Sequence, residues 1–509
     1  MKKDRFYRRL FEIIPGLLTW TTLGGLFILA FIKPLWVAIF VITFDLYWVI
    51  RMTYLSILLV FAYQRLSKER TKDWLALCRS LPKTDGLEFK DIYHAVLFPA
   101  YKEGADVLVP SIEALENTNY PKDRMIVILS VEERAGDEAW KNAERLKRQY
   151  EKSFWQFIIT RHPDGLPGEV KVKGANATWG AKALKDFLDR SKIDYEHVII
   201  SCFDADTCAD KEYFGCLTYH YMTNHDRTRS SYQPIPVYNN NIWHARTVGR
   251  ILELGSSFMQ MIETMRQEKF VTFSSHSMSF KTLVEVGYWP VNMISDDSAI
   301  YWKCFIHFNG HYSVIPIYVT VSMDVATEKK ILPTIIKQYK QKRRWAWGVE
   351  NFPYVAVSFM HNKKIPLITK IRRLLNILEN HYTWAVWAVI ITFIAPLPLI
   401  FGGWIFRQTA IGYNLPSVSA ALFNMSFFTM FICMFISIKL LPARPADVKP
   451  QKRLVMYTQW LLAPIVVAFL GSTPAIDAQT RLMLGRYMHF HVTEKKRHKP
   501  GEKYLRSQP

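Results

Sequence analysis

The chain has 509 residues, of which 50% are hydrophobic, and a formal net charge of +21 at pH 7. Its length allows about two or three domains. The basic residues cluster beside long apolar stretches, which argues against a nucleic-acid binder and favours contact with anionic membrane lipids. None of the 6 cysteines forms a C-x-x-C pair, so neither a zinc site nor a disulfide framework is indicated.

Residues 1–66 are predicted to form a transmembrane hairpin of two spans. Residues 13–32 carry no charge and are about long enough to cross a bilayer core. A second apolar stretch, 34–64, contains Asp45 and Arg51, which we place near an interface because charge at membrane depth is costly. Basic residues flank the hairpin on both sides, so both of its ends are expected in the cytoplasm.

Residues 67–330 are predicted to form a cytoplasmic α/β domain inserted between the transmembrane helices. Short apolar runs alternate there with helical stretches, which predicts a mostly parallel sheet with helices on both faces. We expect strands at 92–98, 125–130, 155–160 and 198–203, and helices at 105–117, 137–151 and 174–190.

The C-terminal third is predicted to return to the membrane. Residues 331–381 are expected to be amphipathic interface helices, and 382–476 a transmembrane region of two or three spans. A complete third span over 454–476 would leave the basic tail, 477–509, outside, whereas the charge rule prefers it inside. A re-entrant or kinked segment lined by protein would reconcile the two, since that stretch contains proline and glycine.

The apolar run 198–203 ends in two carboxylates, Asp204 and Asp206. Residues two apart on an extended strand point the same way, so both side chains are expected at the carboxyl end of a strand. Hard oxygen ligands there suit Mg²⁺ or Mn²⁺ carrying a nucleotide diphosphate. The alternative is a turn capped by aspartates.

Polar residues also follow the first two expected strands. Tyr101 and Glu103 could stack on a base and accept hydrogen bonds from a base or ribose. Glu132 and Glu133 place acidic groups after the second strand. An ordinary loop and a solvated charged turn are the alternatives for these two patterns.

Two helix starts carry further candidates. Lys173-Gly-Ala-Asn176-Ala opens a helix before the acidic strand, where a lysine and a helix N-terminus favour an anion. In Ser295-Asp-Asp297, a carboxylate beside an acceptor hydroxyl would serve as a general base. Helix capping by Ser295 or Asp296 is the alternative, and both can hold if Asp297 is the reacting group.

One helical turn before the C-terminal apolar segments contains Gln341, Arg344 and Trp345. Arginine pairs with phosphate oxygens in a bidentate manner, and tryptophan is a platform for the C–H face of a sugar. The alternative is a basic, aromatic interface helix that rests on lipid headgroups.

In this order and with these gaps, the patterns resemble the membrane-integrated family 2 glycosyltransferases. That group includes cellulose, chitin and hyaluronan synthases and ceramide glucosyltransferase. The resemblance covers about residues 90–350, and the Gln341-x-x-Arg344-Trp345 motif is its most specific element. Two motifs depart from the family pattern: Glu132-Glu133 replaces Asp-Asp-Gly, and Ser295-Asp-Asp297 replaces Thr-Glu-Asp.

The resemblance implies a GT-A fold that binds a nucleotide-sugar, usually a UDP-sugar, with Mg²⁺ or Mn²⁺. It implies that Asp206 ligates the metal, that Asp297 is the base, and that Trp345 supports the acceptor sugar. Residues 273–280 resemble the acceptor-side loop of the family. The residues implied to bind the nucleotide-sugar are Tyr101, Glu103, Glu132 or Glu133, Lys173, Asn176, Asp204, Gln341 and Arg344.

The expected function is therefore inverting transfer of a sugar from a nucleotide-sugar to a growing polysaccharide at the membrane. One alternative is a non-processive transferase that glycosylates a lipid or lipid-linked acceptor. Another is a catalytically inactive membrane protein that binds nucleotide-sugars. The protein is expected to be integral to the cell membrane, and the donor sugar, the linkage and the oligomeric state do not follow from the sequence.

Overall fold

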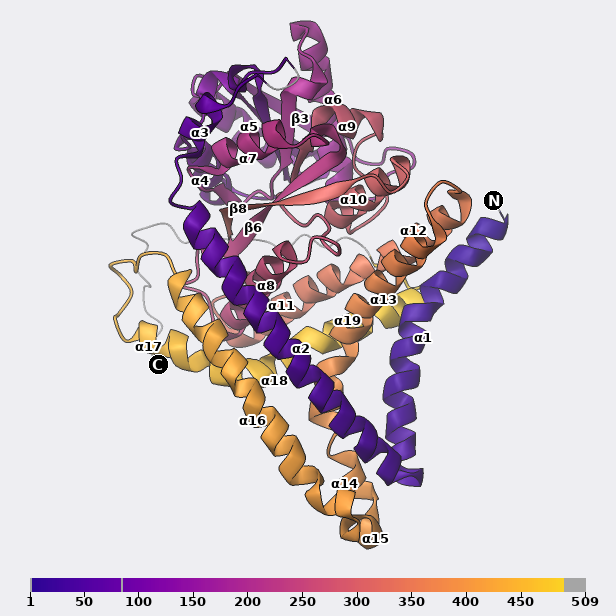
Figure 1. The fold of residues 1–509 in the computed structure, drawn as a ribbon. Helices are drawn as coiled ribbons and strands as arrows, with labels where there is room; N and C mark the ends of the chain where they lie inside the picture. The colour runs from indigo at the N-terminus through magenta and orange to yellow at the C-terminus, as the bar shows by residue number, and fades with distance from the viewer. Residues whose placement is uncertain (1, 84–85, 489–509) are drawn as a thin grey trace. The chain divides into compact units, whose positions relative to one another are not determined.

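The computed structural model describes residues 2–83 and 86–488. They form two compact units, drawn in Figure 1. The α/β unit comprises Leu66–Ile242 and Phe270–Ala326. The helical unit comprises the residues up to Arg65, Trp243–Lys269 and the described residues from Thr327 onward.

The α/β unit contains an 8-stranded sheet of order β3-β2-β1-β4-β7-β6-β8-β5. Strands β3, β2, β1 and β4 are parallel, as expected. Beyond β4 the sheet is mixed, because β7 is antiparallel to both β4 and β6 while β6 and β8 are parallel. The strands are β1 Tyr93–Ala100, β2 Met125–Glu132, β3 Gln156–His162, β4 Val198–Cys202, β5 Cys208–Ala209, β6 Ser230–Tyr238, β7 Ser277–Ser279 and β8 Ser313–Met323.

The first four strands lie where the apolar runs predicted them, whereas β5 to β8 were not anticipated. Strand β6 contains Pro234 and Pro236, and a proline argues against a central strand because it lacks the N–H donor. The structure accommodates Pro234 with a shift in the β6–β8 register between Gln233 and Ile235.

Helices pack around this sheet and include those expected from the sequence. They are α3 Trp74–Ser80, α4 Ala105–Glu116, α5 Asp137–Tyr150, α6 Lys173–Ser191, α7 Tyr213–Thr223, α9 Phe280–Glu285 and α10 Asp296–His307. Short 3₁₀ turns are η1 Phe89–Asp91, η2 Lys122–Arg124, η3 Glu133–Ala135, η4 Tyr195–His197 and η5 Arg227–Arg229.

The two faces of β1 and β2 are covered by different helices. On one face, Val96 and Val127 join a core cluster with apolar residues of α4, α5 and α7. On the other face, Gly180 of α6 approaches so closely that an added Cβ would lie 2.6 Å from Cδ1 of Leu97. All 8 residues of β2 are buried. Coverage of both faces explains why these strands are continuous apolar runs, and confirms the predicted α/β architecture.

The helical unit begins with α1 Lys2–Ile32 and α2 Pro34–Glu69. Its other elements are α8 Thr247–Thr264, α11 Ile331–Ala346, η6 Trp347–Glu350, α12 Asn351–His361, α13 Leu367–Val389, η7 Ile390–Ile394, α14 Leu397–Phe401, α15 Gly403–Gln408, α16 Ala410–Lys439, α17 Lys452–Thr458, η8 Gln459–Leu462, α18 Ala463–Val467, η9 Ala468–Ser472 and α19 Thr473–Met483.

Helix α8 belongs to the helical unit, although it falls inside the range 67–330 expected for the α/β domain. Its residues Ile251 and Leu252 form an apolar cluster with Val466 and Leu470. The buried Arg250 donates from Nε to Oε1 of Gln459 over 2.7 Å. These contacts attach a chain segment between β6 and β7 to the C-terminal helices.

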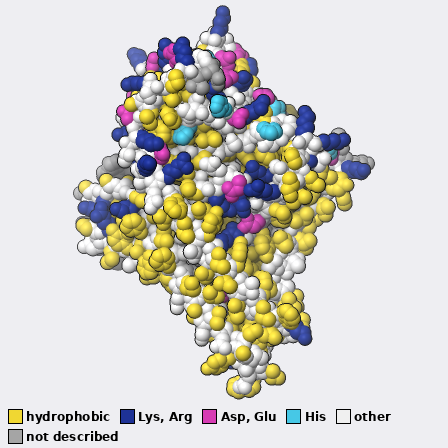
Figure 2. Space-filling model, in the orientation of Figure 1, with side chains coloured by type: hydrophobic (Ala, Val, Ile, Leu, Met, Phe, Trp, Pro, Cys, Tyr) yellow, Lys and Arg dark blue, Asp and Glu magenta, His cyan; other side chains and the backbone are white. Residues whose placement is uncertain are grey.

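Five helical segments of the described chain are long and apolar enough to cross a membrane. Many of their large apolar side chains are exposed, including Phe27 and Ile28 in α1 and Phe428 in α16. Figure 2 shows hydrophobic side chains across the surface of the helical unit, whereas charged groups gather over the α/β unit. Exposed apolar surface of this extent is typical of a membrane or protein interaction site. The segments are Lys3–Ile32, Pro34–Glu69, Leu367–Phe401, Ala410–Lys439 and Lys452–Met483.

The fifth segment, Lys452–Met483, is not a regular helix. It changes from α-helix to a 3₁₀ turn at η8 and to a π-turn at η9, and in Figure 1 it runs across the direction of α2 and α16. Arg9, near the start of α1, donates to the carbonyl oxygen of Leu482 over 2.8 Å. The end of α19 therefore lies beside the basic start of α1, and the re-entrant or kinked segment stays a prediction.

Candidate functional site

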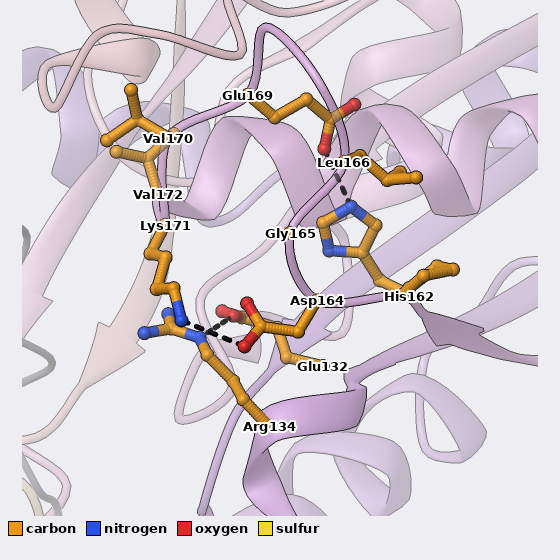
Figure 3. A pocket seen from close by; sticks show the side chains of 11 residues that line it. Glu132, Arg134, His162, Asp164, Gly165, Leu166, Glu169, Val170, Lys171 and Val172 are labelled. Carbon is orange, nitrogen blue, oxygen red and sulfur yellow. Dashed lines mark hydrogen bonds and ion pairs between the residues drawn. The ribbon is translucent and has the colours of Figure 1, made fainter.

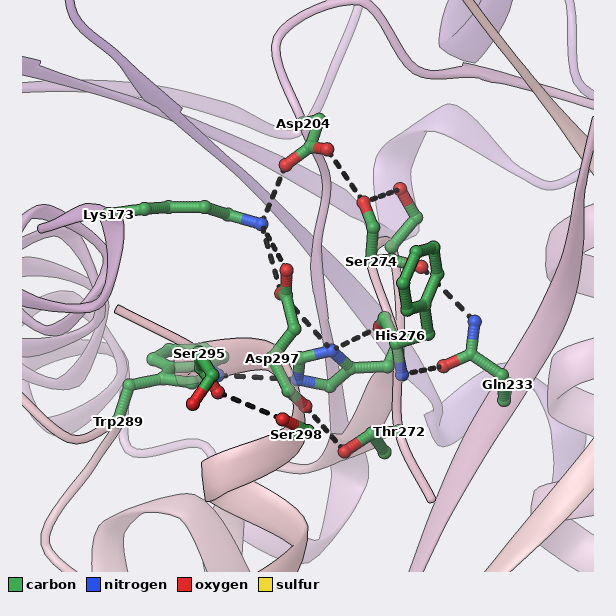
Figure 4. A network of polar contacts seen from close by, with 12 residues as sticks. Lys173, Asp204, Gln233, Thr272, Ser274, His276, Trp289, Ser295, Asp297 and Ser298 are labelled. Carbon is green, nitrogen blue, oxygen red and sulfur yellow. Dashed lines mark hydrogen bonds and ion pairs between the residues drawn. The ribbon is translucent and has the colours of Figure 1, made fainter. Parts of the chain in front are cut away.

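Three charged side chains meet at the carboxyl end of the parallel strands (Figure 4). Nζ of Lys173, the first residue of α6, lies 2.6 Å from Oδ1 of Asp204, which follows β4. The same nitrogen lies 3.0 Å from Oδ1 of Asp297 in the first turn of α10. Burial alone would lower the pKa of Lys173, but the two carboxylates raise it well above the ordinary 10.5. Lys173 is therefore a permanent cation between two candidate site carboxylates.

Gly174 allows α6 and α10 to approach each other at this point. A Cβ on Gly174 would lie 2.4 Å from the carbonyl oxygen of Pro290 and 2.9 Å from Cβ of Asp296. Ser295 occupies the N-cap position of α10, but its side chain makes no capping hydrogen bond. Both aspartates thus lie in the first turn, with Asp296 buried and Asp297 directed at Lys173.

The loop before β7 contacts both carboxylate residues. Oγ of Ser274 donates to Oδ2 of Asp204 over 2.7 Å, and Oγ1 of Thr272 donates to the backbone oxygen of Asp297 over 2.6 Å. The buried Gln233 in β6 accepts from the Phe273 amide over 2.8 Å and donates to the Ser274 carbonyl over 3.1 Å. This loop links strand β6 to the site.

Asp206 occupies a different environment from Asp204. Strand β4 ends at Cys202, and a turn closes with the Thr207 amide donating to the Asp204 carbonyl over 2.9 Å. The sequence predicted an extended strand through both aspartates, and this turn interrupts it. Asp206 is fully buried, and its Oδ2 accepts from the backbone amide of Asp324 over 2.7 Å.

The carboxylates fit a divalent cation only together with ligand oxygens. Asp204 and Asp206 offer hard oxygen donors, the type that Mg²⁺ and Mn²⁺ prefer. Within residues 2–83 and 86–488, no group of ≥ 3 His, Cys, Asp or Glu side chains could hold a metal ion. Mg²⁺ often takes one or two protein carboxylates and completes its shell with phosphate and water, so the donor set is compatible with a metal–diphosphate.

A second site element is a polar pocket beside the ends of β2 and β3 (Figure 3). Glu132 is buried at its edge and forms an ion pair with Arg134. The Arg134 guanidinium lies 4.5 Å from the ring centroid of Tyr101, and the Tyr101 amide donates to Glu103 over 2.6 Å. The lining residues are Glu132, Arg134, His162, Pro163, Asp164, Gly165, Leu166, Glu169, Val170, Lys171 and Val172.

The structure separates the two adjacent glutamates. Glu132 lines the pocket, whereas Glu133 is exposed and accepts a hydrogen bond from the Asp164 amide over 3.1 Å. Among the further lining residues, Nε2 of His162 lies 2.9 Å from Oε2 of Glu169. No sequence motif pointed to this pair, because the two residues meet only when the loop after β3 folds back.

Asn176 links the strand ends and is almost completely buried. Its Nδ2 donates to the carbonyls of Ala100 over 3.1 Å and Ser130 over 2.8 Å, and its Oδ1 accepts from the Ser130 hydroxyl over 2.7 Å. These bonds indicate that Asn176 holds the ends of β1 and β2 against α6. It therefore stabilises the strand ends beside the pocket.

Gln341, Arg344 and Trp345 lie on α11 in the helical unit. Gln341 is buried, and Nζ of Lys342 lies 3.8 Å from the ring centroid of Trp345. The neighbouring Arg343 pairs with Asp477 of α19 over 2.8 Å. The motif is thus part of a packed helical layer, and the ligand contacts that the resemblance implies for it stay predictions.

Solved structures similar to the chain include a mannosyltransferase and a protein solved with UDP-GlcNAc. The mannosyltransferase PcManGT of Pyrobaculum calidifontis, solved with GDP-Man and Mn²⁺, has 13% identity and a TM-score of 0.39 and matches 84% of this chain and 99% of its own. Residues 1–349 of Staphylococcus aureus TarS, solved with UDP-GlcNAc, have 11% identity and a TM-score of 0.38 and match 78% of this chain and 93% of their own.

Curated relatives are the poly-β-1,6-N-acetyl-D-glucosamine synthases of Staphylococcus aureus strains, among them COL and N315. They are 26% identical over 202 residues, which is 37% of this chain and 43% of the relative. The chain thus spans less than half the length of these relatives. Residues 199–443 match the family model "Glycosyl transferase family group 2". Residues 199–443 are therefore similar to glycosyltransferase family group 2, and part of the chain is similar to a polysaccharide synthase.

Proposed function

We propose that this protein is a membrane-integrated, inverting glycosyltransferase that moves a sugar from a UDP-sugar to a growing polysaccharide. The observation that carries the proposal is the Lys173 ammonium between Asp204 and Asp297. It supports the proposal because an ammonium that could pair with a diphosphate lies beside a carboxylate that could accept the proton of an acceptor hydroxyl, at the carboxyl end of the parallel strands.

Asp297 is the proposed base. The acceptor oxygen attacks the anomeric carbon, its proton passes to the Asp297 carboxylate, and the bond from that carbon to the diphosphate breaks. The diphosphate leaves with the electron pair, and Lys173 compensates its charge. A single displacement of this kind inverts the anomeric configuration, so an α-linked donor gives a β-linked product.

The donor is proposed to lie between the pocket of Figure 3 and the Lys173 group. Tyr101, Glu103 and Glu132 would contact the base and ribose, and Asp204 the sugar-nucleotide. Asp206 would hold Mg²⁺ or Mn²⁺, which supplies positive charge to the diphosphate when bound. The α11 residues Gln341, Arg344 and Trp345 would contact diphosphate and acceptor, as the resemblance implies.

A polysaccharide product is favoured by the homology to poly-β-1,6-N-acetyl-D-glucosamine synthases. UDP-N-acetylglucosamine is therefore the first donor to test. The second candidate is a single transfer to a lipid or lipid-linked acceptor, favoured by the small number of candidate spans, 5, available to form a polymer channel. In both cases we propose a cytoplasmic α/β unit, which the basic flanks of the apolar segments support.

The deciding experiment uses the full chain, purified and reconstituted in liposomes. UDP release is measured with a panel of UDP-sugars in the presence of Mn²⁺ or Mg²⁺, and product length is measured by gel filtration. We expect turnover with at least one sugar and a polymeric product. Short glycolipid products would favour the second candidate.

Two variants complete this experiment. Asp297→Asn removes the proposed base and should abolish turnover, whereas Asp137→Asn changes an exposed aspartate whose ion pair with Arg161 lies at the surface. Turnover by Asp297→Asn at the wild-type rate would contradict the assigned base. UDP binding without turnover of any sugar would indicate an inactive nucleotide-sugar-binding protein.

A further inference from the structure

A buried lysine contacts Trp345, the residue proposed to support the acceptor sugar. Lys342 is only 3% exposed, and its Nζ lies 3.8 Å from the ring centroid of the half-buried Trp345. The two residues are three positions apart in α11, so their side chains are neighbours on one face of the helix. Lysine is almost never fully buried unless it is paired, so the other contacts of this ammonium account for its burial.

Helix α8 fixes the position of the ammonium. Nζ of Lys342 donates to Oε2 of Glu253 over 3.2 Å and to Oγ of Ser256 over 2.8 Å. A third acceptor is the carbonyl oxygen of Leu252, at 3.4 Å. A lysine ammonium has three N–H donors, so these oxygens can take all of them. Burial lowers the pKa of Lys342 below the ordinary 10.5, and the Glu253 carboxylate opposes this decrease, which favours the charged form.

The fixed cation restricts the orientation of the Trp345 ring. An ammonium is attracted by the face of an indole, and the attraction is larger where both groups are withdrawn from water. Rotation of the indole to another side-chain rotamer would break this contact. Helix α11 is also held against α19, because Arg343 pairs with Asp477 over 2.8 Å. The helix is therefore not free to turn in compensation, and the ring is kept in one orientation.

We infer that Lys342 is a positioning residue for Trp345, and this inference rests on the proposed function. A ring that supports a sugar determines where the acceptor hydroxyl lies relative to the anomeric carbon. When the acceptor is misplaced, water takes its part: the water oxygen attacks the anomeric carbon, its proton passes to the proposed base, and UDP leaves with the electron pair. The product is then free sugar. Loss of the cation should therefore increase donor hydrolysis and leave donor affinity unchanged.

The deciding variant replaces both Lys342 and Glu253 by methionine in the full chain. It removes the cation without leaving the Glu253 charge buried and unpaired, so it separates ring positioning from stability. In liposomes, the ratio of released free sugar to transferred sugar should rise about tenfold, the effect of one desolvated cation–π contact. KM for the UDP-sugar and UDP affinity should stay at wild-type values. Lys337→Met, which breaks the ion pair of Lys337 in α11 with Glu328, is the matched control.

Trp345→Leu tests whether Lys342 acts through the ring. This variant should raise hydrolysis as the methionine pair does, and the triple combination should give no further increase, because both changes remove the same support. Multiplying effects, or a wild-type ratio in the methionine pair, would overturn the inference. If the methionine pair does not fold, Lys342→Gln with Glu253→Gln also lacks the cation, keeps a neutral hydrogen bond between the helices, and is held to the same expectation.

A further measurement does not need turnover. In full-length protein labelled with 5-fluorotryptophan, the fluorine signal of Trp345 is identified by its loss in Trp345→Phe. We expect this signal to shift in the methionine pair and to keep its position in Lys337→Met. A Trp345 signal that does not respond to loss of the cation would overturn the inference. Absence of turnover in the wild type would instead contradict the proposed function, and the fluorine signal would still test Lys342.

Discussion

Nζ of Lys173 lies 3.0 Å from Oδ1 of Asp297, although the two residues are 124 positions apart in the chain. The ammonium also binds Asp204, so the cation and two candidate site carboxylates form one half-buried group. A ligand that brings a diphosphate would replace these carboxylates as partners of Lys173. We therefore propose that binding of the donor releases Asp297, the proposed base, from its ion pair with Lys173.

Replacement of Lys173 by methionine should remove this coupling. We expect UDP-sugar turnover to fall by about 10²–10³-fold and KM for the donor to rise, because a cation that compensates the leaving diphosphate is lost. Lys173→Arg, which keeps the charge, should retain more activity. Lys182→Met on the same helix removes an exposed lysine and serves as the control. Wild-type kinetics in Lys173→Met would exclude the assigned role.

Asp206→Asn should weaken the metal-dependent part of UDP binding. The isosteric amide keeps an oxygen that can accept from the Asp324 amide but loses the negative charge that a divalent cation requires. Titration calorimetry with UDP, with and without Mn²⁺, measures this difference. The exposed Asp186→Asn on α6 is the control. An unchanged metal dependence in Asp206→Asn would remove Asp206 as a ligand.

Glu132 and Glu133 should respond differently to the same substitution. Glu132→Gln alters the buried partner of Arg134 at the pocket, and we expect KM for the donor to rise by about tenfold, the effect of one charge-assisted hydrogen bond. Glu133→Gln changes an exposed side chain and should leave KM within about twofold. Steady-state kinetics of the two variants test the assignment, which fails if Glu133→Gln has the larger effect.

The Lys342–Glu253 pair is buried in the helical unit. We expect the protein to lose more stability when one partner is replaced than when both are. Nζ and Oε2 are 3.2 Å apart, with both side chains almost inaccessible. Either single replacement by methionine leaves a buried charge and should destabilise by about 3–5 kcal/mol, whereas the double replacement should recover most of that loss. Thermal unfolding of the wild type, the two single variants and the double variant in detergent measures these changes in stability. Additive single effects would show that the pair is not coupled.

Because of His94 in β1, the free energy of unfolding should decrease in mild acid. Burial lowers its pKa to about 3 from the ordinary 6.5, so below about pH 6.5 the unfolded chain binds a proton that the folded chain does not. Stability therefore decreases as pH falls from that value, by at most about 1.4 kcal/mol per pH unit.

His94→Gln keeps an amide for the Thr218 hydroxyl, which lies 2.7 Å from Nε2, and does not titrate. The drop in melting temperature between about pH 7 and about pH 5 should be smaller in this variant than in wild type. The exposed His311→Gln should behave as wild type. Equal drops in wild type and His94→Gln would refute the expectation.

Much of the α/β unit followed from local patterns. Parallel strands covered on both faces must be continuous apolar runs, so β1 to β4 were visible in the sequence. Strand β6 was not, because Pro234 and Pro236 contradict strand propensity, and only pairing with β8 and a register shift accommodate them. Helix α8 was assigned to the α/β domain because nothing in its own sequence shows that its partners are Val466 and Leu470.

The sequence by itself determined the kind of protein: apolar segments long enough for a bilayer, an alternating strand–helix domain, and acidic, basic and aromatic motifs in the order of one glycosyltransferase family. Those features depend on composition and short periodicities, which are local. Only the tertiary structure decided that Lys173 joins Asp204 to Asp297 and that Glu132 and not Glu133 lines the pocket. Such choices depend on contacts between segments far apart in the chain, and these form only when the sheet and its helices close around the buried strands.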